Sequence, residues 1–549
     1  MKHWKKTGVA LAALFALLLP PISVSAAEMG DPMRIGLYYG DTALPAANLE
    51  NAEGQGYYLG YYNEEGQFFS LAWTGETQLT MVKTRNMYLT SSGYSDSSTE
   101  GGLLGCYHIQ LGTGYAGYHE VLALAEQYEN AFPAWTNGAY SVRMGSYKSR
   151  ADAEAAIAQL GLEGAVVGET SAYGINVVKT KTTKILFQFD HGEDFPLVVR
   201  PGLDPETKAA TWFKGYKYYG DFRYERADGN DLSVVNVVDM EDYINCVISR
   251  EMSESWPVEA LKAQAICARN YAEQKRGRHK ADDFDLCSNT HCQAYYGMGR
   301  TGENTAEAAA ATNGIYAWYN GELAETYYFS SSGGATENPN TVWGGTKEYP
   351  YLTGVVDPYE ATIADQIKSG APGGGYTWSV TYTTDQLTEL LRSKGYQCAE
   401  IVDLRISEFS PTGNVATLTF TDKEGKQYSF SREKVIRTWM GAYSVRYTIS
   451  GGGEYFVNND GSALSTMNGV FSIGADGTPT RIGIESMPYV ITSQGAVQQL
   501  SAPGDTFTLH GAGWGHNVGM SQWGAHAMAL LGKTYDEILR FYYTGIELY

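Results

Sequence analysis

Hydrophobic and polar residues alternate along most of the first half of the chain, in short runs that end at glycine-rich turns. Alternation with a period of two is typical of half-buried strands. Six runs carry it: residues 34–40, 56–73, 78–89, 184–190, 196–202 and 232–238. Asp228-Gly229-Asn230 is predicted to form the hairpin turn that precedes the last of them. A strand-like pattern continues over residues 242–248.

The period changes to that of a helix after Pro257. Apolar residues then recur on one face at Val258, Leu261, Ala265 and Ala268. Proline suits the first turn of a helix and Glu259 complements its N-terminal dipole, so a long helix is predicted here. Glu251 is therefore expected on a short turn between the strand-like run and this helix, where a half-buried acid can act as a proton donor.

Two segments in the first third of the chain resemble each other, residues 107–128 and 140–161. Each is predicted to form an alternating strand, a glycine turn and an amphipathic helix. A further strand is expected at residues 131–138, before the second copy, and another at residues 172–178, after it. The predicted order is β-α-β-β-α-β.

The composition indicates a turn-rich protein of more than one domain. The chain has 549 residues, of which 63 are glycine and 42 tyrosine, and only 18% are charged. A chain of this length is expected to divide into two or three domains. The formal net charge of −21 argues against nucleic acid as a partner, because phosphate binding needs a basic surface, and it disfavours docking onto anionic lipid.

The N-terminus predicts export. Three lysines among the first six residues precede an apolar run at residues 8–19, and small residues follow up to Ala26. This pattern is typical of a secretory signal peptide, here residues 1–26, with an apolar run too short to cross a bilayer comfortably. Its removal takes three lysines and no acid, so the net charge becomes −24. We expect a secreted or cell-wall-associated protein with no membrane span after cleavage; an uncleaved anchor is the alternative.

The repeated segments and the phrase YSVRMGSY, with a helix beginning near Ala151, make residues 105–180 similar to the sporulation-related repeat (SPOR) domain. The resemblance implies binding to peptidoglycan glycan strands stripped of their stem peptides. The candidate sugar contacts are Tyr107, Tyr140, Arg143 and Tyr147. Tyrosine rings suit sugar faces because their hydroxyl groups can stay in water. A packing domain without a ligand is the alternative. Residues 27–104 are expected to be a β-rich segment that ends in a polar linker at residues 91–102.

Two longer motifs carry a second resemblance. One is VNVVDMEDYI, followed by VISREM and SWPVEALKAQAICARNYA; the other is GAGWGHNVGMSQWGAHAMALLGKTYDEILRFYYTG near the C-terminus. In this order they resemble the stage II sporulation protein D/LytB family. The resemblance implies a catalytic core over residues 181–549, with helices that flank a cleft and a small α+β insertion at about 376–446. The fold class expected for the whole chain is therefore α+β, with a β-rich multi-domain core and the βαββαβ SPOR-like domain.

The same resemblance implies a lytic transglycosylase that cleaves the MurNAc–GlcNAc bond of denuded glycan and leaves 1,6-anhydroMurNAc ends, with Glu251 as the sole catalytic carboxylate. Ordinary glycosidases use two carboxylates. Here the C6 hydroxyl of the sugar can attack its own anomeric carbon, and intramolecular reactions reach effective molarities on the order of 10⁵ M or more. As an acid near neutral pH, Glu251 needs a pKa raised by apolar neighbours such as Met252 and Trp256. Glu254 is the alternative acid, although its polar setting suits a helix cap.

A second function is compatible with the same family. The LytB half of the family name implies a non-catalytic protein that binds peptidoglycan and enhances or targets a cell-wall amidase. Such a protein would have no need of the acid at Glu251, whereas the intact motifs around Glu251 favour the enzyme.

Two further segments are expected to line the same cleft. Residues 327–345 contain a turn that resembles the serine-rich segment of the family. Its candidate substrate contacts are Ser330, Ser331, Ser332, Gly333 and Gly334. The glycine-dense stretch at residues 513–525 can bring backbone close to a ligand. Its candidates are His516, Gln522 and Trp523. Asn517 stands where the family commonly has glycine, and asparagine also tolerates a positive φ. For the serines, an ordinary polar turn or a nucleophile paired with histidine is the alternative.

Cysteine and histidine gather in one polar loop. Cys287, His291 and Cys292 lie within six residues of one another, and His279 precedes them. Thiolate and imidazole at this density suit tetrahedral zinc, in a closed structural site or in one that leaves a position to water. A Cys287–Cys292 disulfide and free thiols are the alternatives. A zinc ion is expected to order the loop rather than to take part in the chemistry, because Glu251 already fills the role of the acid.

Overall fold

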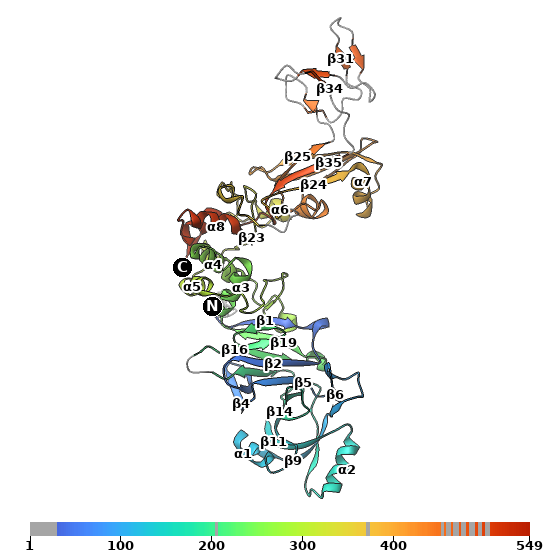
Figure 1. The fold of residues 1–549 in the computed structure, drawn as a ribbon, viewed down its shortest axis with the longest axis vertical. Coiled ribbons are helices and arrows are strands. Elements are labelled where there is room, and N and C mark those ends of the chain that lie inside the picture. The colour runs from blue at the N-terminus through green and yellow to red at the C-terminus, as the bar shows by residue number, and fades with distance from the viewer. Residues whose placement is uncertain are drawn as a thin grey trace, which may run out of the picture.

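The computed structural model describes residues 30–203, 207–368, 374–451 and 506–549, together with the backbone of short strands between residues 455 and 499. The predicted signal peptide lies outside the described residues. Figure 1 shows an elongated molecule in which β-sheets, a layer of helices and a second α+β unit follow one another along the long axis. The chain is an α+β protein, as predicted.

Two large sheets build the lower half of the molecule in Figure 1. The seven-stranded sheet has the order β20 (Leu286–Cys287), β1 (Met33–Tyr38), β19 (Ser233–Val238), β18 (Asp221–Glu225), β15 (Leu197–Pro201), β3 (Tyr57–Tyr62) and β4 (Phe68–Thr74). The ten-stranded sheet has the order β12 (Val166–Gly168), β9 (Tyr107–Tyr115), β11 (Ala139–Tyr147), β10 (Ala131–Thr136), β14 (Ile185–Asp190), β13 (Ile175–Lys179), β5 (Gln78–Lys83), β2 (Ala46–Glu53), β16 (Ala210–Phe213) and β17 (Tyr216–Tyr218). Apolar side chains from both sheets share one core, which accounts for their alternating patterns.

The repeated segments form β9, α1 (Tyr118–Ala125), β10, β11, α2 (Arg150–Leu160) and β12. Their strands lie in the order β12-β9-β11-β10. A strand, β13, does form at the predicted residues 172–178, but its assignment to this unit is wrong. It pairs with β5 and β14, and β12 is the last strand of the unit. The first four residues of β13 are buried, so this strand needs neighbours on both edges. The unit is therefore continuous with the ten-stranded sheet through β10 and β14.

The predicted linker at residues 91–102 is part of a small sheet. Strand β6 (Met87–Thr90) pairs with β7 (Gly93–Ser95) and with β8 (Gly102–Leu104). The hydroxyl group of Tyr94 donates a hydrogen bond to the carbonyl oxygen of Thr182 at 2.6 Å. The serine and glycine content that suggested a linker reflects tight turns between short strands.

The helical layer sits above the sheets in Figure 1. It contains α3 (Met240–Glu251), α4 (Val258–Gln274), α5 (Glu303–Ala311), α8 (Gln522–Leu530) and α9 (Tyr535–Tyr542). Helix α4 is the long helix that the sequence predicts, and it packs against the other four. Thr534 and Glu537 form a capping box at the start of α9. Within the described residues, no helix has the length and apolar character needed to span a membrane.

The α+β insertion is larger than predicted. It contains β24 (Thr377–Thr383), α7 (Thr384–Ser393), β25 (Ile401–Phe409), β26 (Val415–Asp422), β27 (Gln427–Phe430), the helical turn Lys434–Trp439, β28 (Tyr447–Gly451) and β35 (Thr506–Ala512). Strand β35 lies between β24 and β28, so the chain returns to this unit after residue 505. The unit has a core of its own, with Trp378, Leu404 and Leu509 among its buried residues.

Short elements join the helical layer to the insertion. Strand β23 (Tyr328–Phe329) runs parallel to β36 (Met520–Ser521), which sets the serine-rich segment beside the C-terminal motif. Helix α6 (Pro339–Trp343) follows β23. The remaining short strands are β21 (Ala317–Tyr319), β22 (Glu322–Leu323), β37 (Glu547–Leu548), β29 (Tyr455–Phe456), β30 (Ala463–Leu464), β31 (Phe471–Ile473), β32 (Pro479–Arg481), β33 (Tyr489–Ile491) and β34 (Val497–Gln499).

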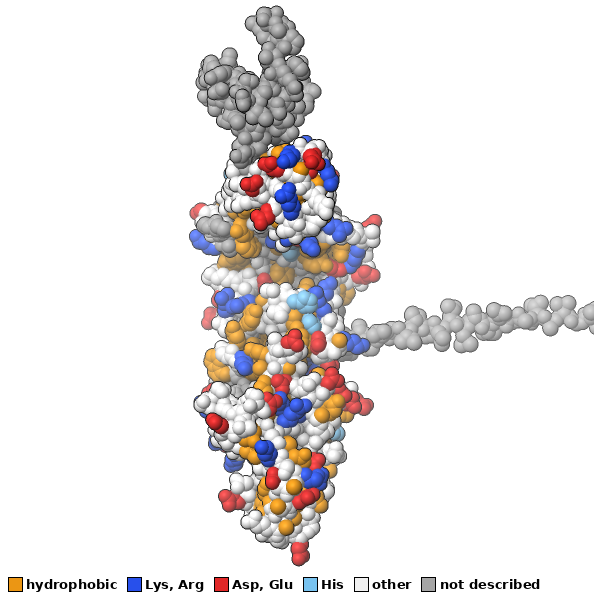
Figure 2. Space-filling model, turned by 90° about the vertical axis from the view of Figure 1, so that its right-hand side faces the viewer, with side chains coloured by type: hydrophobic (Ala, Val, Ile, Leu, Met, Phe, Trp, Pro, Cys, Tyr) orange, Lys and Arg blue, Asp and Glu red, His pale blue; other side chains and the backbone are white. Residues whose placement is uncertain are grey.

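Acidic and basic side chains are interspersed on the face drawn in Figure 2, and no large patch of one sign covers it. Histidine side chains gather near mid-height on this face. The strong net negative charge is therefore spread over the surface here rather than concentrated.

Candidate active site

Glu251 is the last residue of helix α3, not a residue of a turn after a strand. The run at residues 242–248, predicted as strand-like, is helical. Asp239 caps this helix by accepting a hydrogen bond from the backbone N–H of Glu241. Tyr243 and Val247, four residues apart, are both buried, a spacing that fits the period of a helix. The C-terminal end of a helix carries partial negative charge, which disfavours a carboxylate there.

The Glu251 carboxyl group is held by two side chains from distant segments. The side-chain amide of Gln522 donates a hydrogen bond to Oε2 at 3.2 Å, and the hydroxyl group of Tyr328 also hydrogen bonds to the carboxyl group. Gln293 donates to the Tyr328 oxygen at 3.2 Å and accepts from the hydroxyl of Tyr243 at 2.8 Å. Because Tyr328 accepts this bond, its own proton is directed at Glu251.

Burial raises the pKa of Glu251 above the usual range of a carboxyl group. The hydrogen bonds from Gln522 and Tyr328 and the nearby charge of Arg250 favour the ionised form, but they do not cancel the loss of hydration. The site therefore holds a carboxyl group that remains protonated to a higher pH than a free glutamate.

We expect glycan cleavage to fall as pH rises through the raised pKa of Glu251, because the group can donate a proton only while protonated. Replacing Gln522 by methionine removes a hydrogen bond that favours the carboxylate, so the decline should move to higher pH. Rate measurements from pH 4 to 9 on wild type and Gln522→Met test this. A decline that stays in place, or moves to lower pH, would contradict the assignment.

Glu254 has a different role. Its carboxylate oxygens accept hydrogen bonds from the backbone N–H groups of Asn304 at 2.7 Å and Thr305 at 3.0 Å. These are unpaired groups in the first turn of α5, where a carboxylate also complements the helix dipole. Glu254 is thus a cap for a second helix.

Two tryptophans come from the segments that hold Glu251. Trp256 follows α3, and Trp523 is the neighbour of Gln522; their ring centroids are 4.7 Å apart. The ring of Trp256 also stacks on His526 at 4.4 Å. Trp343 and Trp514 pack elsewhere, against His516 and Tyr443 respectively. His526 gives no signal in the sequence, since a lone histidine in a helix is common.

The serine-rich turn does not expose all of its serine side chains, contrary to the prediction. Ser331 and Ser332 are fully buried, and their hydroxyl groups donate to Glu360 at 2.7 Å and to Asp357 at 3.2 Å. The prediction that these two hydroxyl groups contact sugar directly is therefore wrong, and their role is structural. Ser330 is half-buried, and its carbonyl oxygen accepts from the backbone N–H of Trp523 at 3.0 Å.

The two glycines that follow are required by packing. Gly333 has φ 66° and Gly334 has φ 115°, a region that favours glycine. A Cβ atom on Gly333 would lie 2.2 Å from the carbonyl oxygen of Ala512. The turn is thus pressed against the β35 segment of the insertion.

Asp357 and Glu360 belong to a buried hydrogen-bond network that the sequence does not reveal. Glu360 accepts hydrogen bonds from the backbone N–H of Ser332 at 2.6 Å and from the hydroxyl of Ser521. Asp357 accepts from the hydroxyl of Tyr542 at 2.7 Å. Burial raises the pKa of both carboxyl groups. Because Ser521 caps α8 and precedes Gln522, this network fixes the amide that contacts Glu251.

The C-terminal motif reaches the site through Gln522. Asn517 has φ 64°, the positive value expected at a position where the family commonly has glycine. Its side-chain amide donates hydrogen bonds to the carbonyl oxygens of Ser332 at 2.7 Å and Ala335 at 3.0 Å. His516 packs on Phe329, with ring centroids 5.3 Å apart. Successive side chains of a strand point to opposite faces, so β23 separates His516 from the Tyr328 that contacts Glu251.

The four predicted metal ligands come together in the structure. The ligand atoms of His279, Cys287, His291 and Cys292 all lie within 4.8 Å of one another. The Cys287 sulfur is 3.5 Å from Nδ1 of His291, and the Cys292 sulfur is 3.5 Å from Nε2 of His279. Tetrahedral zinc with ordinary Zn–S and Zn–N bonds would separate sulfur from nitrogen by about 3.6 Å. The donor set fits zinc, and both cysteines are free thiols rather than a disulfide.

The loop that carries these ligands is tied to the acid. Asp282 lies 3.3 Å from Nδ1 of His279, an arrangement that orients metal-binding histidines. Gln293 directly follows Cys292 and hydrogen bonds to Tyr328, which contacts Glu251. Ordering this loop therefore also orders the hydrogen bonds of the acid.

The candidate sugar contacts of the SPOR-like segment are not all available. Arg143 is buried, and its guanidinium group donates to Gln188, to Gln110 and to the Glu169 carbonyl oxygen. The prediction that Arg143 binds sugar directly is therefore wrong. The hydroxyl of Tyr140 donates to the Leu71 carbonyl oxygen at 2.6 Å, which anchors the segment to β4. The other two candidates, Tyr107 and Tyr147, are half-exposed partners across β9 and β11.

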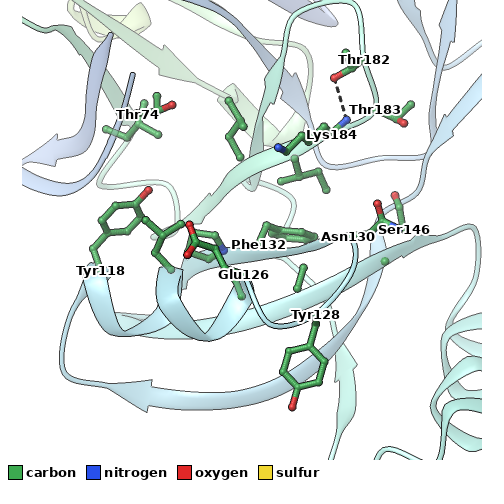
Figure 3. Close-up of a pocket in the computed structure, with 18 of the residues that line it drawn as sticks. Thr74, Tyr118, Glu126, Tyr128, Asn130, Phe132, Ser146, Thr182, Thr183 and Lys184 are labelled. Atoms are coloured by element: carbon green, nitrogen blue, oxygen red, sulfur yellow. Dashed lines mark hydrogen bonds between the residues drawn. The ribbon is translucent and has the colours of Figure 1, made fainter. Parts of the chain in front are cut away.

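A groove of about 1060 Å³ lies between this segment and the two sheets. Figure 3 shows Thr74 and Tyr118 at one end and Ser146 with Thr182 and Thr183 at the other. Glu251 is not among its lining residues. The groove is thus separate from the candidate active site.

Comparison with known proteins identifies relatives. Residues 228–319, which contain Glu251 and all four cysteine and histidine ligands, match the family model described as SpoIID, stage II sporulation protein. Stage II sporulation protein D of Bacillus subtilis is 26% identical over 331 residues, covering 57% of this chain and 75% of that protein. An uncharacterized protein of Brachyspira hyodysenteriae is 28% identical over 354 residues, covering 64% and 77%.

A relative with a different printed function also matches. The amidase enhancer of Bacillus subtilis is 29% identical over 318 residues, covering 55% of this chain and 39% of that protein. The motifs around Glu251 lie within the region that matches the family model, so residues 228–319 are similar to the stage II sporulation protein (SpoIID) family.

Proposed function

We propose that this protein is a lytic transglycosylase of denuded peptidoglycan glycan, with Glu251 as general acid and then general base. The observation that carries the proposal is a single half-buried carboxyl group with a raised pKa, held by Gln522 and Tyr328. A glycosidase that activates water needs a second carboxylate at a defined distance. A substrate that supplies its own nucleophile does not.

The proposed reaction uses one carboxyl group twice, first as acid and then as base. Protonated Glu251 gives its proton to the glycosidic oxygen as the bond from that oxygen to C1 of the muramic residue breaks. The C6 hydroxyl oxygen forms a bond to C1, and its proton passes to the Glu251 carboxylate. The products are a free GlcNAc hydroxyl and a 1,6-anhydro end, and no water is consumed. Tyr328 and Gln522 stabilise the carboxylate between the two transfers.

Product analysis tests the proposal. Purified protein is incubated with sacculi from which an amidase has removed the stem peptides, and the soluble fragments are analysed by mass spectrometry. We expect 1,6-anhydro ends. Reducing ends would indicate a hydrolase. If no soluble fragments are released, the proposal that the protein is an enzyme has no support.

The amidase enhancer among the relatives favours one alternative, a non-catalytic protein that binds peptidoglycan and enhances a cell-wall amidase. Under this alternative the chain alone releases nothing, and it accelerates peptide release by an added amidase to the same extent with glutamate or glutamine at position 251. Under the proposed function, the Glu251→Gln variant loses glycan cleavage even if it still enhances the added amidase.

We further propose that His279, Cys287, His291 and Cys292 hold a structural zinc ion. When bound, zinc supplies a closed four-ligand crosslink that orders the loop. The chain's own contribution is then to place Gln293 so that it orients Tyr328. The protein is expected to sit in the cell envelope, with glycan strands as its substrate.

Metal analysis checks the zinc proposal. Protein purified without chelator should contain about one zinc per chain, and Cys287→Ser should lose most of it with a lower melting temperature. Cys398→Ser, a thiol of the insertion far from the loop in sequence, is the matched control and should keep its zinc. Zinc content near zero in the wild type, or equal content in both variants, would reject the site.

A further inference from the structure

An exposed tryptophan lies at the junction of the helical layer and the insertion. Trp343 ends α6 and is 38% exposed although it is a large apolar side chain. Its ring centroid is 5.0 Å from that of Tyr327 and 5.2 Å from that of His516. The next residue, Gly344, has φ 76°, which turns the chain beneath the insertion. One side of the Trp343 ring system thus remains open to solvent.

A free arginine from the insertion covers this turn. Three guanidinium atoms of Arg432 lie 3.0–3.1 Å from the position that a Cβ atom on Gly344 would occupy. Arg432 is exposed. Within the described part of the chain it forms no ion pair, whereas its neighbour Glu433 pairs with Arg437. An unpaired arginine is notable in a chain with a net charge of −21, where carboxylates are abundant.

The neighbouring Arg437 is paired with Glu433 and adds no free charge at this place. The charge of Arg437 contributes, after burial, to lowering the pKa of His516 to about 4, so Arg437 acts on the ring that Trp343 contacts. His516 is neutral near pH 7 and donates no charge of its own. The guanidinium group of Arg432 thus lies beside Gly344, the residue directly after Trp343, and the two side chains come from two parts of the fold.

We propose that Trp343 and Arg432 form a subsite for a muramic acid residue, in which the sugar packs on the indole and the lactyl carboxylate binds the guanidinium group. The planar guanidinium group suits a carboxylate because it can donate two parallel hydrogen bonds. Indole suits the apolar face of a sugar because it offers a large rigid surface. This subsite, the Trp343–Arg432 subsite, rests on the proposed function for the identity of its ligand.

The subsite supplies a physical reason for preferring denuded glycan. While a stem peptide is attached, the lactyl group ends in a neutral amide bond. After an amidase has removed the peptide, it ends in a carboxylate, and every muramic residue along the strand carries one. Tyr327, which contacts Trp343, precedes the Tyr328 that contacts Glu251. The adjacent residues Tyr327 and Tyr328 therefore connect the indole of the subsite to Glu251.

Binding to two forms of glycan tests the subsite without requiring cleavage. The Glu251→Gln protein is co-sedimented with denuded sacculi, and with denuded sacculi whose lactyl carboxylates have been converted to amides by carbodiimide and ammonia. We expect at least tenfold weaker binding to the amidated form. Adding Arg432→Gln should weaken binding to the denuded form to a similar degree and abolish the difference between the two forms.

Lys434→Gln is the matched control, because it removes an exposed positive charge two residues away. It should keep the wild-type preference, and Arg432→Lys should restore part of the binding. Equal binding of the parent protein to both glycans, or a preference that survives Arg432→Gln, overturns the subsite. Failure of the proposed function shows separately, as absence of anhydro ends from wild-type protein acting on denuded sacculi.

Discussion

Replacing Glu251 by glutamine should reduce the release of anhydromuramic fragments by about 10²–10⁴-fold, the range typical of a lost general acid–base. Glutamine keeps the size of the side chain and can still accept the hydrogen bond from Gln522, but it has no proton to donate. The rate is measured as soluble anhydro ends released per unit time from amidase-treated sacculi.

The same variant should be more stable than wild type at high pH. Burial raises the pKa of Glu251 in the folded protein, so its contribution to stability is present below the pKa of the unfolded chain and is lost as pH rises through the folded value. Thermal melting of Glu251→Gln should therefore match wild type near pH 4 and exceed it near pH 8. Loss of activity with a gain in stability excludes misfolding as the cause.

Glu254→Gln provides the control for this experiment. It changes the same functional group three residues away, where the carboxylate caps α5. We expect a loss of up to about 2 kcal/mol in stability and near-normal cleavage. Wild-type activity in Glu251→Gln, or equal losses in the two variants, would remove Glu251 from the mechanism.

Replacing Glu360 by alanine should lower the free energy of unfolding by about 3 kcal/mol or more, because it strands several buried donors. The hydroxyl groups of Ser331 and Ser521 and the backbone N–H of Ser332 all donate to this carboxylate. Chemical denaturation measures the loss. The variant should also lose cleavage, since Ser521 precedes the amide that contacts Glu251.

Glu348→Ala is the matched control, because Glu348 is exposed in the same part of the chain. A change below about 0.5 kcal/mol is expected there. A Glu360→Ala protein as stable as this control would show that the buried network does not hold the serine-rich turn. A stable variant with full activity would show that the turn does not position Gln522.

Local patterns predicted much of the fold. The helix after Pro257 and the positive φ of Asn517 each depend on neighbouring residues, and the structure has both. The four cysteine and histidine ligands also lie close in sequence, so their convergence needs only one loop.

The predictions that were wrong concern features that depend on long-range packing. Residues 242–248 contain β-branched side chains that favour strand, yet packing against α4 and the capping by Asp239 make them helical. Asp357 and Glu360 resemble surface acids, and only the fold shows that serines from other segments bury them. One sheet partner of β13, strand β5, likewise lies far away in sequence.

The central claim is that the substrate supplies its own nucleophile to a single acid. Cleavage of denuded sacculi in water enriched in oxygen-18 tests it directly, with mass analysis of every new chain end. If the C6 hydroxyl is the nucleophile, the new ends are 1,6-anhydro ends that carry no oxygen-18. Reducing ends with one oxygen-18 atom each would show that water is the nucleophile, and would contradict it.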